Sequence, residues 1–393
     1  MSKQLPRGWK EFALKDIGNF LRGSGISKKD LSDTGIPAIR YGDIYTKYDF
    51  VIKNVSSFTN SKGTELKKGD ILFAGSGETA EEIGKSVAFI DDYKAFAGGD
   101  IIIFRPNIDL NSLFLSYILN SGKCRKDISI MGQGHTVVHI YASSLEILKV
   151  ILPPLDEQKR IADILSTFDD LIENLKKLIE KKEIYKKGVM QRVLTGEVSF
   201  NGFTDEWEEV YIKDVGTIIT GNTPSTKDKS FWGGKHVWVT PTDINKKDID
   251  NSERKLTDIG LSKARKLPKN TLLVTCIASI GKNSILRCEG SCNQQINAII
   301  PNKNFSAEFL YYIFENNKEY LNAKAPASAT KIISKTEFEK LSFILPKIEE
   351  QNKIAELLTL IDKDIEILKQ ILQLRKLQKK GVMQKLLTGE VRV

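Results

Sequence analysis

The sequence of 393 residues lacks several features that would assign it to a membrane, secreted or metal-binding class. It contains no run of about 18 apolar residues, and its N-terminus MSKQLPRGWKEF has no apolar signal-peptide core, so we expect a cytoplasmic protein without a membrane contact. The four cysteines form no CxxC pair. The three histidines (His135, His139 and His236) complete no zinc spacing, so no metal site is predicted.

The strings that catalysis requires are also missing. A Walker A loop needs a glycine five residues before GKS or GKT. Thr79 occupies that position before the GKS at Gly84, and the GKN at Gly281 has asparagine in place of the serine or threonine. GSGETAEEIG departs from the dinucleotide spacing GxGxxG, and LPPL at Leu152 has leucine where the tetrad of a base methyltransferase has an amide. We therefore predict no catalytic residue and no cofactor in this chain.

Positive charge is in modest excess. The formal net charge is +9 and the pI is about 9.1, which favours a polyanionic partner, with nucleic acid ahead of a membrane surface. The length allows two or three domains, each with its own core.

The chain contains an internal repeat. Residues 152–198 recur without a gap, at an offset of 193, as residues 345–391. This period is too long for a solenoid, so the repeat indicates a duplicated module that ends in a helix of fixed length. Each helix is predicted to begin near Asp156 or Glu349 and to end near Gly188 or Gly381.

Apolar residues in both helical segments follow a heptad seam with spacings of 4, 3, 4, 3 and 4, typical of a coiled-coil pair. The short connection between the first helix and the next module favours antiparallel pairing, which would return the C-terminal GVMQKLLTGEV toward the N-terminal module. An alternative is that each helix packs only on its own module. The predicted seam consists of Ile161, Leu165, Phe168, Ile172, Leu175 and Ile179 and of Ile354, Leu358, Ile361, Ile365, Leu368 and Leu372.

The two globular halves are related more loosely. GWKEFALKDIG at Gly8 matches EWEEVYIKDVG at Glu206, and later matches drift in offset, so insertions are confined to the loops of a shared scaffold. Short apolar runs such as DILFAG, DIIIF, TLLVTCI and NAIIP predict strands, and FLSYIL and FLYYIF predict helices, which indicates a mixed α/β fold.

Polar, glycine-rich loops between these strands hold the hydroxyl, amide and basic side chains that read base edges and hold phosphates. Taken singly, such loops are more often solvated turns. The candidate DNA-contacting residues in the first half are Ser24, Ser27, Lys28, Arg40, Tyr41, Ser76, Thr79, Lys85, His135 and Thr136. In the second half they are Thr223, Ser225, Thr226, Lys227, Trp232, Thr240, Thr242, Lys282, Asn283, Gln294, Gln295 and Lys331.

The order of these motifs resembles that of the DNA-specificity subunits of type I restriction-modification systems. The resemblance rests on the openers WKEFALKDIG and WEEVYIKDVG, the segments PPLDEQKRIA and PKIEEQNKIA, and the closers GVMQRVLTGEV and GVMQKLLTGEV. It implies two α/β target-recognition domains (1–151 and 199–344) and two helical spacers (152–198 and 345–393) that form an antiparallel coiled coil with pseudo-twofold symmetry.

The resemblance also implies a function and partners. Each domain would read one half of a split asymmetric site in double-stranded DNA, and the helices would set the gap. The chain would have no activity of its own. Two modification subunits that bind S-adenosylmethionine would dock on it, and restriction subunits that consume ATP would join them. Two alternatives are a self-contained methyltransferase or nuclease, which would need a cofactor loop, and a coiled-coil DNA scaffold without sequence preference.

Overall fold

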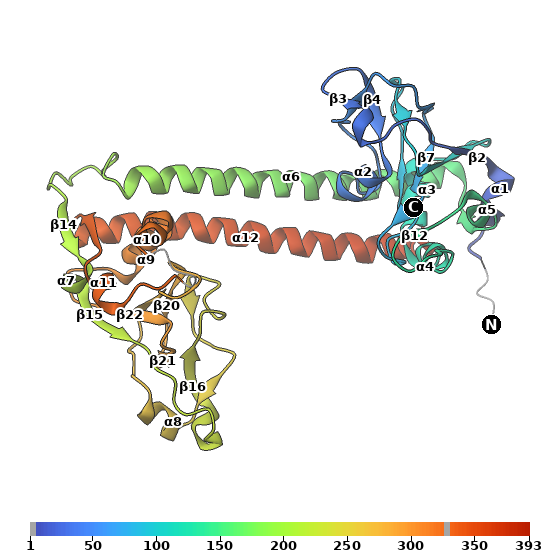
Figure 1. The fold of residues 1–393 in the computed structure, drawn as a ribbon. Helices are drawn as coiled ribbons and strands as arrows, with labels where there is room; N and C mark the ends of the chain where they lie inside the picture. Colours follow the sequence, from blue (N-terminus) through green and yellow to red (C-terminus); the bar gives the residue numbers. More distant parts are fainter. Residues whose placement is uncertain (1–4, 326–330) are drawn as a thin grey trace. The chain divides into compact units, whose positions relative to one another are not determined.

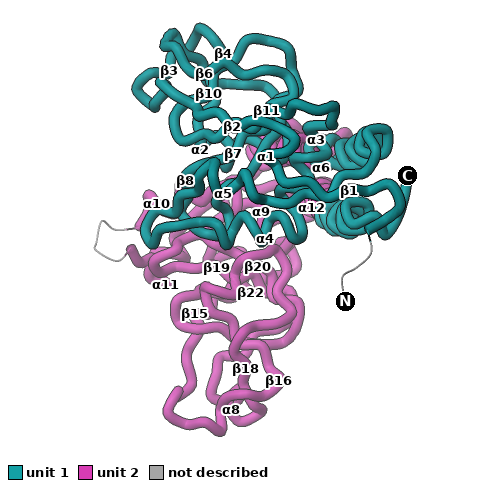
Figure 2. Tube along the Cα trace, turned by 90° about the vertical axis from the view of Figure 1, so that its right-hand side faces the viewer, with its two compact units in different colours: residues 1–175, 371–393 teal, residues 176–370 magenta. Residues whose placement is uncertain are grey.

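The computed structural model describes residues 5–325 and 331–393. The chain divides into two compact units, unit 1 (Met1–Leu175 with Ile371–Val393) and unit 2 (Lys176–Gln370), which Figure 2 colours separately. Two long helices, α6 (Leu155–Val193) and α12 (Ile348–Leu387), each contribute one part to each unit. None of the helices in the described residues is long and apolar enough to cross a membrane.

The shorter elements of unit 1 are mostly brief strands joined by loops (Figure 1). The helices are α1 (Leu14–Ile17), α2 (Tyr41–Thr46), α3 (Ser112–Leu119), α4 (Gly122–Ile130) and α5 (Ala142–Glu146). The strands are β1 (Lys10–Ala13), β2 (Gly18–Arg22), β3 (Leu31–Ser32), β4 (Ile36–Ile39), β5 (Phe58–Thr59), β6 (Thr64–Glu65), β7 (Ile71–Ala74), β8 (Ser76–Gly77), β9 (Ser86–Ala88), β10 (Phe96–Ala97), β11 (Ile101–Pro106), β12 (Val138–His139) and β13 (Lys149–Leu152).

Unit 2 repeats this plan with its own lengths. Its shorter helices are α7 (Ile212–Val215), α8 (Asp258–Lys263), α9 (Ala307–Asn316), α10 (Lys318–Lys324) and α11 (Lys335–Glu339). Its strands are β14 (Glu208–Tyr211), β15 (Gly216–Thr220), β16 (Trp232–Val239), β17 (Asp248–Ile249), β18 (Lys255–Leu256), β19 (Thr271–Thr275), β20 (Asn283–Leu286), β21 (Gly290–Cys292), β22 (Ile296–Pro301) and β23 (Ser342–Leu345).

The main sheets of the two units share four strands in the same order, and unit 2 adds β17 at one edge. In unit 1 the strand order is β2-β11-β7-β9, and in unit 2 it is β15-β22-β19-β20-β17. A second sheet holds the parallel pair β4 and β10 in unit 1 and the parallel pair β16 and β21 in unit 2. The opening and closing strands also pair, β1 with β13 and β14 with β23, each antiparallel. The wandering sequence offsets therefore reflect loops of different length on one scaffold, as predicted.

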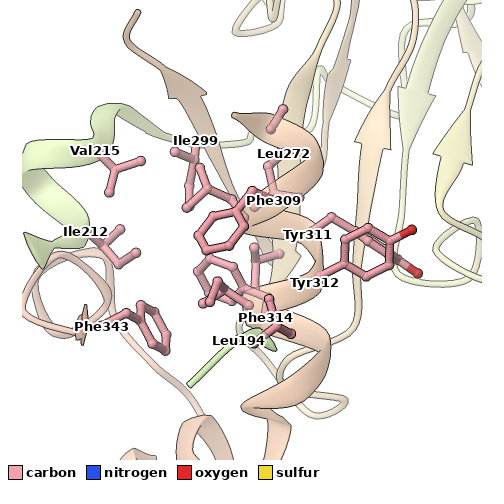
Figure 3. Packing of buried hydrophobic residues seen from close by; sticks show 14 of the residues in the cluster. Leu194, Ile212, Val215, Leu272, Ile299, Phe309, Tyr311, Tyr312, Phe314 and Phe343 are labelled. Carbon is pink, nitrogen blue, oxygen red and sulfur yellow. The ribbon is translucent and has the colours of Figure 1, made fainter. Parts of the chain in front are cut away.

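The central strands of each main sheet are buried on both faces, because their side chains alternate between two cores. In β7, Ile71 and Phe73 join the core that contains α3 and the start of α6, whereas Leu72 and Ala74 join the core beneath the second sheet. In unit 2, Leu272 of β19 belongs to the core that contains α9 (Figure 3). The four apolar runs quoted above were confirmed as β7, β11, β19 and β22, and the predicted helices as α3 and α9.

Both long helices continue beyond the predicted ends at Gly188 and Gly381, to Val193 and Leu387. Glycine within a helix costs about 1 kcal/mol relative to alanine. That cost is offset, because Met190 and Val193 lie buried in the core of unit 2, as does Leu194 just beyond the helix (Figure 3). Each buried apolar side chain contributes roughly 1.5–3 kcal/mol. The tertiary core therefore extends the helices past a local stop signal.

The two helices run antiparallel within each unit. In unit 1, Glu157 at the start of α6 pairs with Arg392 after α12, and Asp169 pairs with Lys379. In unit 2, Lys182 pairs with Asp364 and Lys186 with Asp362. Higher numbers on α6 thus meet lower numbers on α12 in both units. The C-terminal GVMQKLLTGEV packs in unit 1, where Leu386 is buried in the core that holds Trp9.

The first part of each seam lies in the core of the module that precedes its helix. Ile161 and Leu165 belong to the unit 1 core, and Ile354, Leu358, Ile361 and Ile365 to the unit 2 core. Further along, Ile172 and Ile179 are buried, while Phe168, Leu175, Leu368 and Leu372 are partly buried. The helices therefore pack both on a globular module and on each other, which combines the two arrangements that the sequence left open.

Candidate nucleic-acid interface

Three loops of unit 2 come together into one polar surface. Thr223 Oγ1 donates to Gln294 Oε1 at 2.5 Å, which joins the loop after β15 to the loop after β21. The backbone N–H of Asn293 donates to the carbonyl of Val239 at 2.9 Å, which brings the loop after β16 beside them. In that third loop the hydroxyls of Thr240 and Thr242 lie 2.8 Å apart. Eight of the predicted contact residues in unit 2 therefore lie on these adjoining loops: Thr223, Ser225, Thr226, Lys227, Thr240, Thr242, Gln294 and Gln295.

The basic candidates of unit 2 lie in loops close to this surface. The N–H of Cys276 in the loop after β19 donates to the carbonyl of Gln295 at 2.8 Å, and the N–H of Ala278 in the same loop donates to the carbonyl of Lys331 at 3.1 Å. Lys282 and Lys331 are exposed and form no ion pair with any residue in the described ranges. The same holds for Lys227 in the loop after β15. Three uncompensated cations are thus available to phosphates.

The remaining candidates of unit 2 divide into exposed and buried residues. Ser225 and Thr226 are exposed, and the carbonyl of Ser225 accepts from Trp232 Nε1 at 3.0 Å. Asn283 is buried in β20, where its Nδ2 donates to Glu315 Oε1 at 2.8 Å. Its amide is therefore not available to a base in this conformation.

Unit 1 brings its corresponding loops together by the same strand contact. The pairing of β8 with β12 sets the loop of Thr79 beside that of His135 and Thr136, all three of which are exposed. In unit 2 the isolated bridge between Ile277 and Ile332 occupies the equivalent place. The frame therefore presents the same pair of loops in both units.

Three other candidates in unit 1 have structural roles. Ser76 is buried and its Oγ lies 3.0 Å from His139 Nδ1. Lys85 Nζ donates to the carbonyl of Tyr48 at 2.5 Å, and burial lowers the pKa of Lys85. Arg40 pairs with Asp43 at 3.3 Å.

The other candidates in unit 1 lie at the surface. Ser24 Oγ lies 3.0 Å from Thr64 Oγ1, and Ser27 donates to Asp30 at 2.6 Å. Lys28 and Tyr41 are exposed.

The EQ pair of each repeat seals the start of a long helix onto its module. Gln158 Nε2 donates to the carbonyl of Pro153 at 2.9 Å, and its Oε1 accepts from the N–H of Asn111, which caps α3, at 2.9 Å. Gln351 makes the same two bonds in unit 2, at 2.8 and 3.0 Å. A motif that carries the family resemblance is therefore explained by packing.

The glutamate of the same motif binds the tryptophan of the opener. Trp9 Nε1 donates to Glu157 Oε2 at 3.3 Å, and the equivalent indole of unit 2 donates to Glu350 Oε2 at 3.1 Å. Arg392 donates to Glu157 Oε1 at 2.6 Å, whereas Ser199 holds the corresponding oxygen of Glu350, also at 2.6 Å. Openers and EQ segments thus meet at one junction in each unit.

A second junction, which we call the clasp, joins three elements in each unit. In unit 1, Tyr117 Oη of α3 donates to Asp169 Oδ2 of α6 at 2.6 Å, and Lys379 Nζ of α12 binds Asp169 Oδ1. Lys379 also lies 4.1 Å from the ring centre of Phe50. Burial and the Asp169 carboxylate raise the pKa of Tyr117, so its phenol stays protonated and donates.

The unit 2 clasp uses the equivalent residues. Tyr312 Oη donates to Asp362 Oδ2 at 2.7 Å, and Lys186 Nζ lies 2.5 Å from Asp362 Oδ1. Lys247 adds a further contact, since its Nζ donates to Thr359 Oγ1 at 2.7 Å. Burial lowers the pKa of Lys247. Each clasp holds a module, its own helix and the other helix at one point.

Comparison with known proteins agrees with this architecture. The sequence model of the family described as "Type I restriction modification DNA specificity domain" matches residues 6–183 and 204–375, so the chain belongs to that family. Its two matched segments correspond to the two repeated halves.

Relatives and solved structures of similar extent are found. The MjaVIII type I restriction enzyme specificity subunit of Methanocaldococcus jannaschii is 25% identical over 423 residues, covering 99% of this chain and 94% of the relative. The EcoKI specificity subunit of Escherichia coli is 24% identical over 395 residues, covering 90% and 82%. The crystal structure of a type I restriction-modification S subunit from M. genitalium shares the fold, with a TM-score of 0.64, 16% identity and 98% of each chain covered.

Proposed function

We propose that this chain is the DNA-specificity subunit of a type I restriction-modification complex, in which each unit reads one half of a split asymmetric site. The observation that carries the proposal is the duplicated frame. The central strands of the two main sheets pair in the same register, while the loops that bear polar and basic side chains differ between the units. Two equivalent readers with different loops suit a site whose halves have different sequences.

Charge supports a DNA partner. The formal net charge is +9, and Lys227, Lys282 and Lys331 are exposed cations on the gathered loops of unit 2 or on segments hydrogen-bonded to them. Such cations bind phosphates and release counterions, which supplies affinity independent of sequence. The hydroxyls and amides beside them, Thr223 and Gln294 among them, supply groups that discriminate bases.

Apolar residues on the outer faces of the long helices support a protein partner. Leu178 and Ile184 of α6 and Ile367 of α12 lie in unit 2, with exposed fractions of 42%, 66% and 53%. Leu374 and Leu377 of α12 lie in unit 1, with exposed fractions of 63% and 58%. Exposed apolar rows are typical of binding surfaces. They suit two modification subunits, which would supply S-adenosylmethionine and the methyl transfer, and restriction subunits that use ATP would join them.

In this assembly the chain contributes recognition and the partners contribute the chemistry. It would act in the cytoplasm, where the double-stranded DNA that it binds is located. The paired helices would set the gap between the half-sites, because their repeat has no insertion or deletion. The domain limits would be 1–151 and 199–344, with the spacers between and after them.

The test is an exchange of residues 1–151 for the matching domain of a relative. The chain is expressed with the modification subunit of its own organism in a host that lacks methylation, and methylated sites are sequenced. We expect one half-site to change and the other to stay. Simultaneous change of both halves would contradict independent reading, and methylation without any sequence preference would favour the scaffold alternative.

A second test addresses the placement of the interface. Alanine at Gln294, Gln295, Lys227 and Lys282 together should weaken DNA binding by the complex. The matched control replaces Lys269 and Lys303, which are exposed on other turns of unit 2, with alanine. Unchanged affinity in the fourfold variant, or an equal loss in the control, would refute this placement.

A further inference from the structure

Unit 2 contains an arginine whose guanidinium lies over the ring of Trp232, beside the gathered loops. The guanidinium carbon of Arg254 lies 3.8 Å from the ring centre of Trp232 and 5.2 Å from that of Trp238. The two indoles meet edge to face, at 4.8 Å and 83°. Attraction between the cation and the ring faces therefore orients the guanidinium.

The indoles themselves are held firmly. Trp232 Nε1 donates to the carbonyl of Ser225 at 3.0 Å, and Trp238 Nε1 donates to that of Asn222 at 3.1 Å. Trp238 is buried, with an exposed fraction of 2%. Both acceptor carbonyls belong to the loop that also carries Thr223. The stack is thus built onto the candidate interface.

The segment that carries Arg254 is tied to another loop of the interface. The N–H of Glu253 donates to Asp243 Oδ1 at 2.9 Å, and Asp243 Oδ2 accepts from Thr240 Oγ1 at 2.7 Å. Arg254 itself is exposed and forms no ion pair with any residue in the described ranges. Its N–H groups are therefore oriented by the stack yet not consumed by a carboxylate.

Strand register identifies the equivalent positions in unit 1. Leu31 pairs with Thr59 as Trp232 pairs with Leu256, so Leu31 is equivalent to Trp232. The parallel pair β4 and β10 corresponds to the parallel pair β16 and β21, so Ala38 is equivalent to Trp238. Ser57 precedes β5 as Arg254 precedes β18.

Unit 1 therefore has leucine, alanine and serine where unit 2 has the stack. The strand pairing is the same in both units at this point, but the side chains differ. A position of this kind is what two readers of different half-sites require.

We propose that Arg254 is a base-reading residue of the second half-site, and that it donates two hydrogen bonds to O6 and N7 of a guanine in the major groove. Trp232 acts as the positioning residue that holds the guanidinium over its ring. The planar fork of arginine matches these two acceptors, and this pairing is the commonest specific contact in the major groove. The inference rests on the proposed function.

The experiment compares methylated motifs of the complex carrying Arg254→Ser, Arg254→Lys or Trp232→Leu with those of the original complex. Arg254→Ser introduces the residue that unit 1 has, at an exposed position, so folding of unit 2 should be preserved, which a thermal melt checks. We expect discrimination to fall about 5- to 150-fold at one guanine of the second half-site, with the first half-site unchanged. Lysine should restore discrimination only partly, because it lacks the fork.

Trp232→Leu should reduce discrimination at the same guanine although the arginine remains, and Trp232→Phe should restore part of it. Lys303→Ser is the control for loss of one exposed positive charge in unit 2. An unchanged motif in Arg254→Ser would overturn the inference, as would a uniform loss at all sites equal to that of the control, which a phosphate contact would give. Absence of any bipartite motif from the original complex would instead refute the proposed function.

Discussion

The two clasps offer a prediction of stability, because the same three residue types occur at two levels of burial. In unit 1 the side chains of Lys379 and Asp169 are 10% and 23% exposed. In unit 2 those of Lys186 and Asp362 are 23% and 28% exposed. Removal of the lysine should therefore cost more in unit 1 than in unit 2.

The magnitudes follow from burial. Breaking a fully buried pair costs about 3–5 kcal/mol because one charge is left without a partner, whereas an exposed pair contributes roughly 0–1 kcal/mol. Lys379 also lies 4.1 Å from the Phe50 ring centre, whereas Lys186 lies 5.7 Å from that of Tyr312. We expect Lys379→Ala to lower the stability of unit 1 by about 3 kcal/mol, and Lys186→Ala to lower that of unit 2 by about 1–2 kcal/mol.

The assay is native-state hydrogen exchange read by mass spectrometry over a urea series, because peptides from each unit report that unit separately. Asp169→Asn and the double variant with Lys379→Ala complete a cycle that isolates the pair. Lys379→Arg is the control that keeps the charge. Equal losses in the two units, or a larger loss for Lys186→Ala, would refute the argument from burial.

Three further expectations concern the helices, the charge and the thiols. One heptad inserted after both Leu175 and Leu368 keeps the seam in register and adds about 10 Å to each helix, so methylome sequencing should find unchanged half-sites and a gap longer by roughly three base pairs; an active variant with the original gap would exclude a measuring role. Binding of DNA should weaken steeply with salt, and alanine at Lys227 and Lys282 should reduce the slope of log K against log salt by about 2, unless these lysines miss the phosphates. Iodoacetamide should label Cys288 first in the native chain, because the other three thiols are buried and burial raises their pKa, to about 11 for Cys124 and about 12 for Cys276 and Cys292; mass spectrometry that finds Cys276 labelled first would contradict this.

Much of the architecture is encoded locally and could be predicted from the string. A strand such as β7 is a run of four apolar residues, and a heptad seam repeats at short range, so both are legible from neighbours along the chain. The gapless repeat likewise predicted two equivalent modules and their helices. The antiparallel pairing followed from the short connection between Leu194 and Glu206, since a short link limits where the next module can begin.

The ends of the helices and the state of single side chains depended on tertiary contacts. Gly188 is a local stop signal, but the helix passes it because Met190 and Val193 find a core. Asn283 has an amide that could bond to a base and was predicted as a DNA-contacting residue, yet it lies in a buried strand and donates a hydrogen bond to Glu315. The sequence alone does not show which face of a strand is covered, so the burial of the Asn283 amide could not be deduced.

The candidate interface is the part that only the tertiary structure decided. Residue type and loop composition predicted Thr223 and Gln294 individually, but their contact at 2.5 Å depends on the pairing of β15 with β22 in one sheet and of β21 with β16 in another. Arg254 was missed entirely, because nothing in its neighbourhood along the chain distinguishes it from other exposed arginines. Its orientation comes from Trp232 and Trp238, which strand pairing places beneath it. The sequence therefore determines the modules and the helices through short-range periodicity, whereas recognition depends on contacts between distant segments, which exist only once the strands have paired.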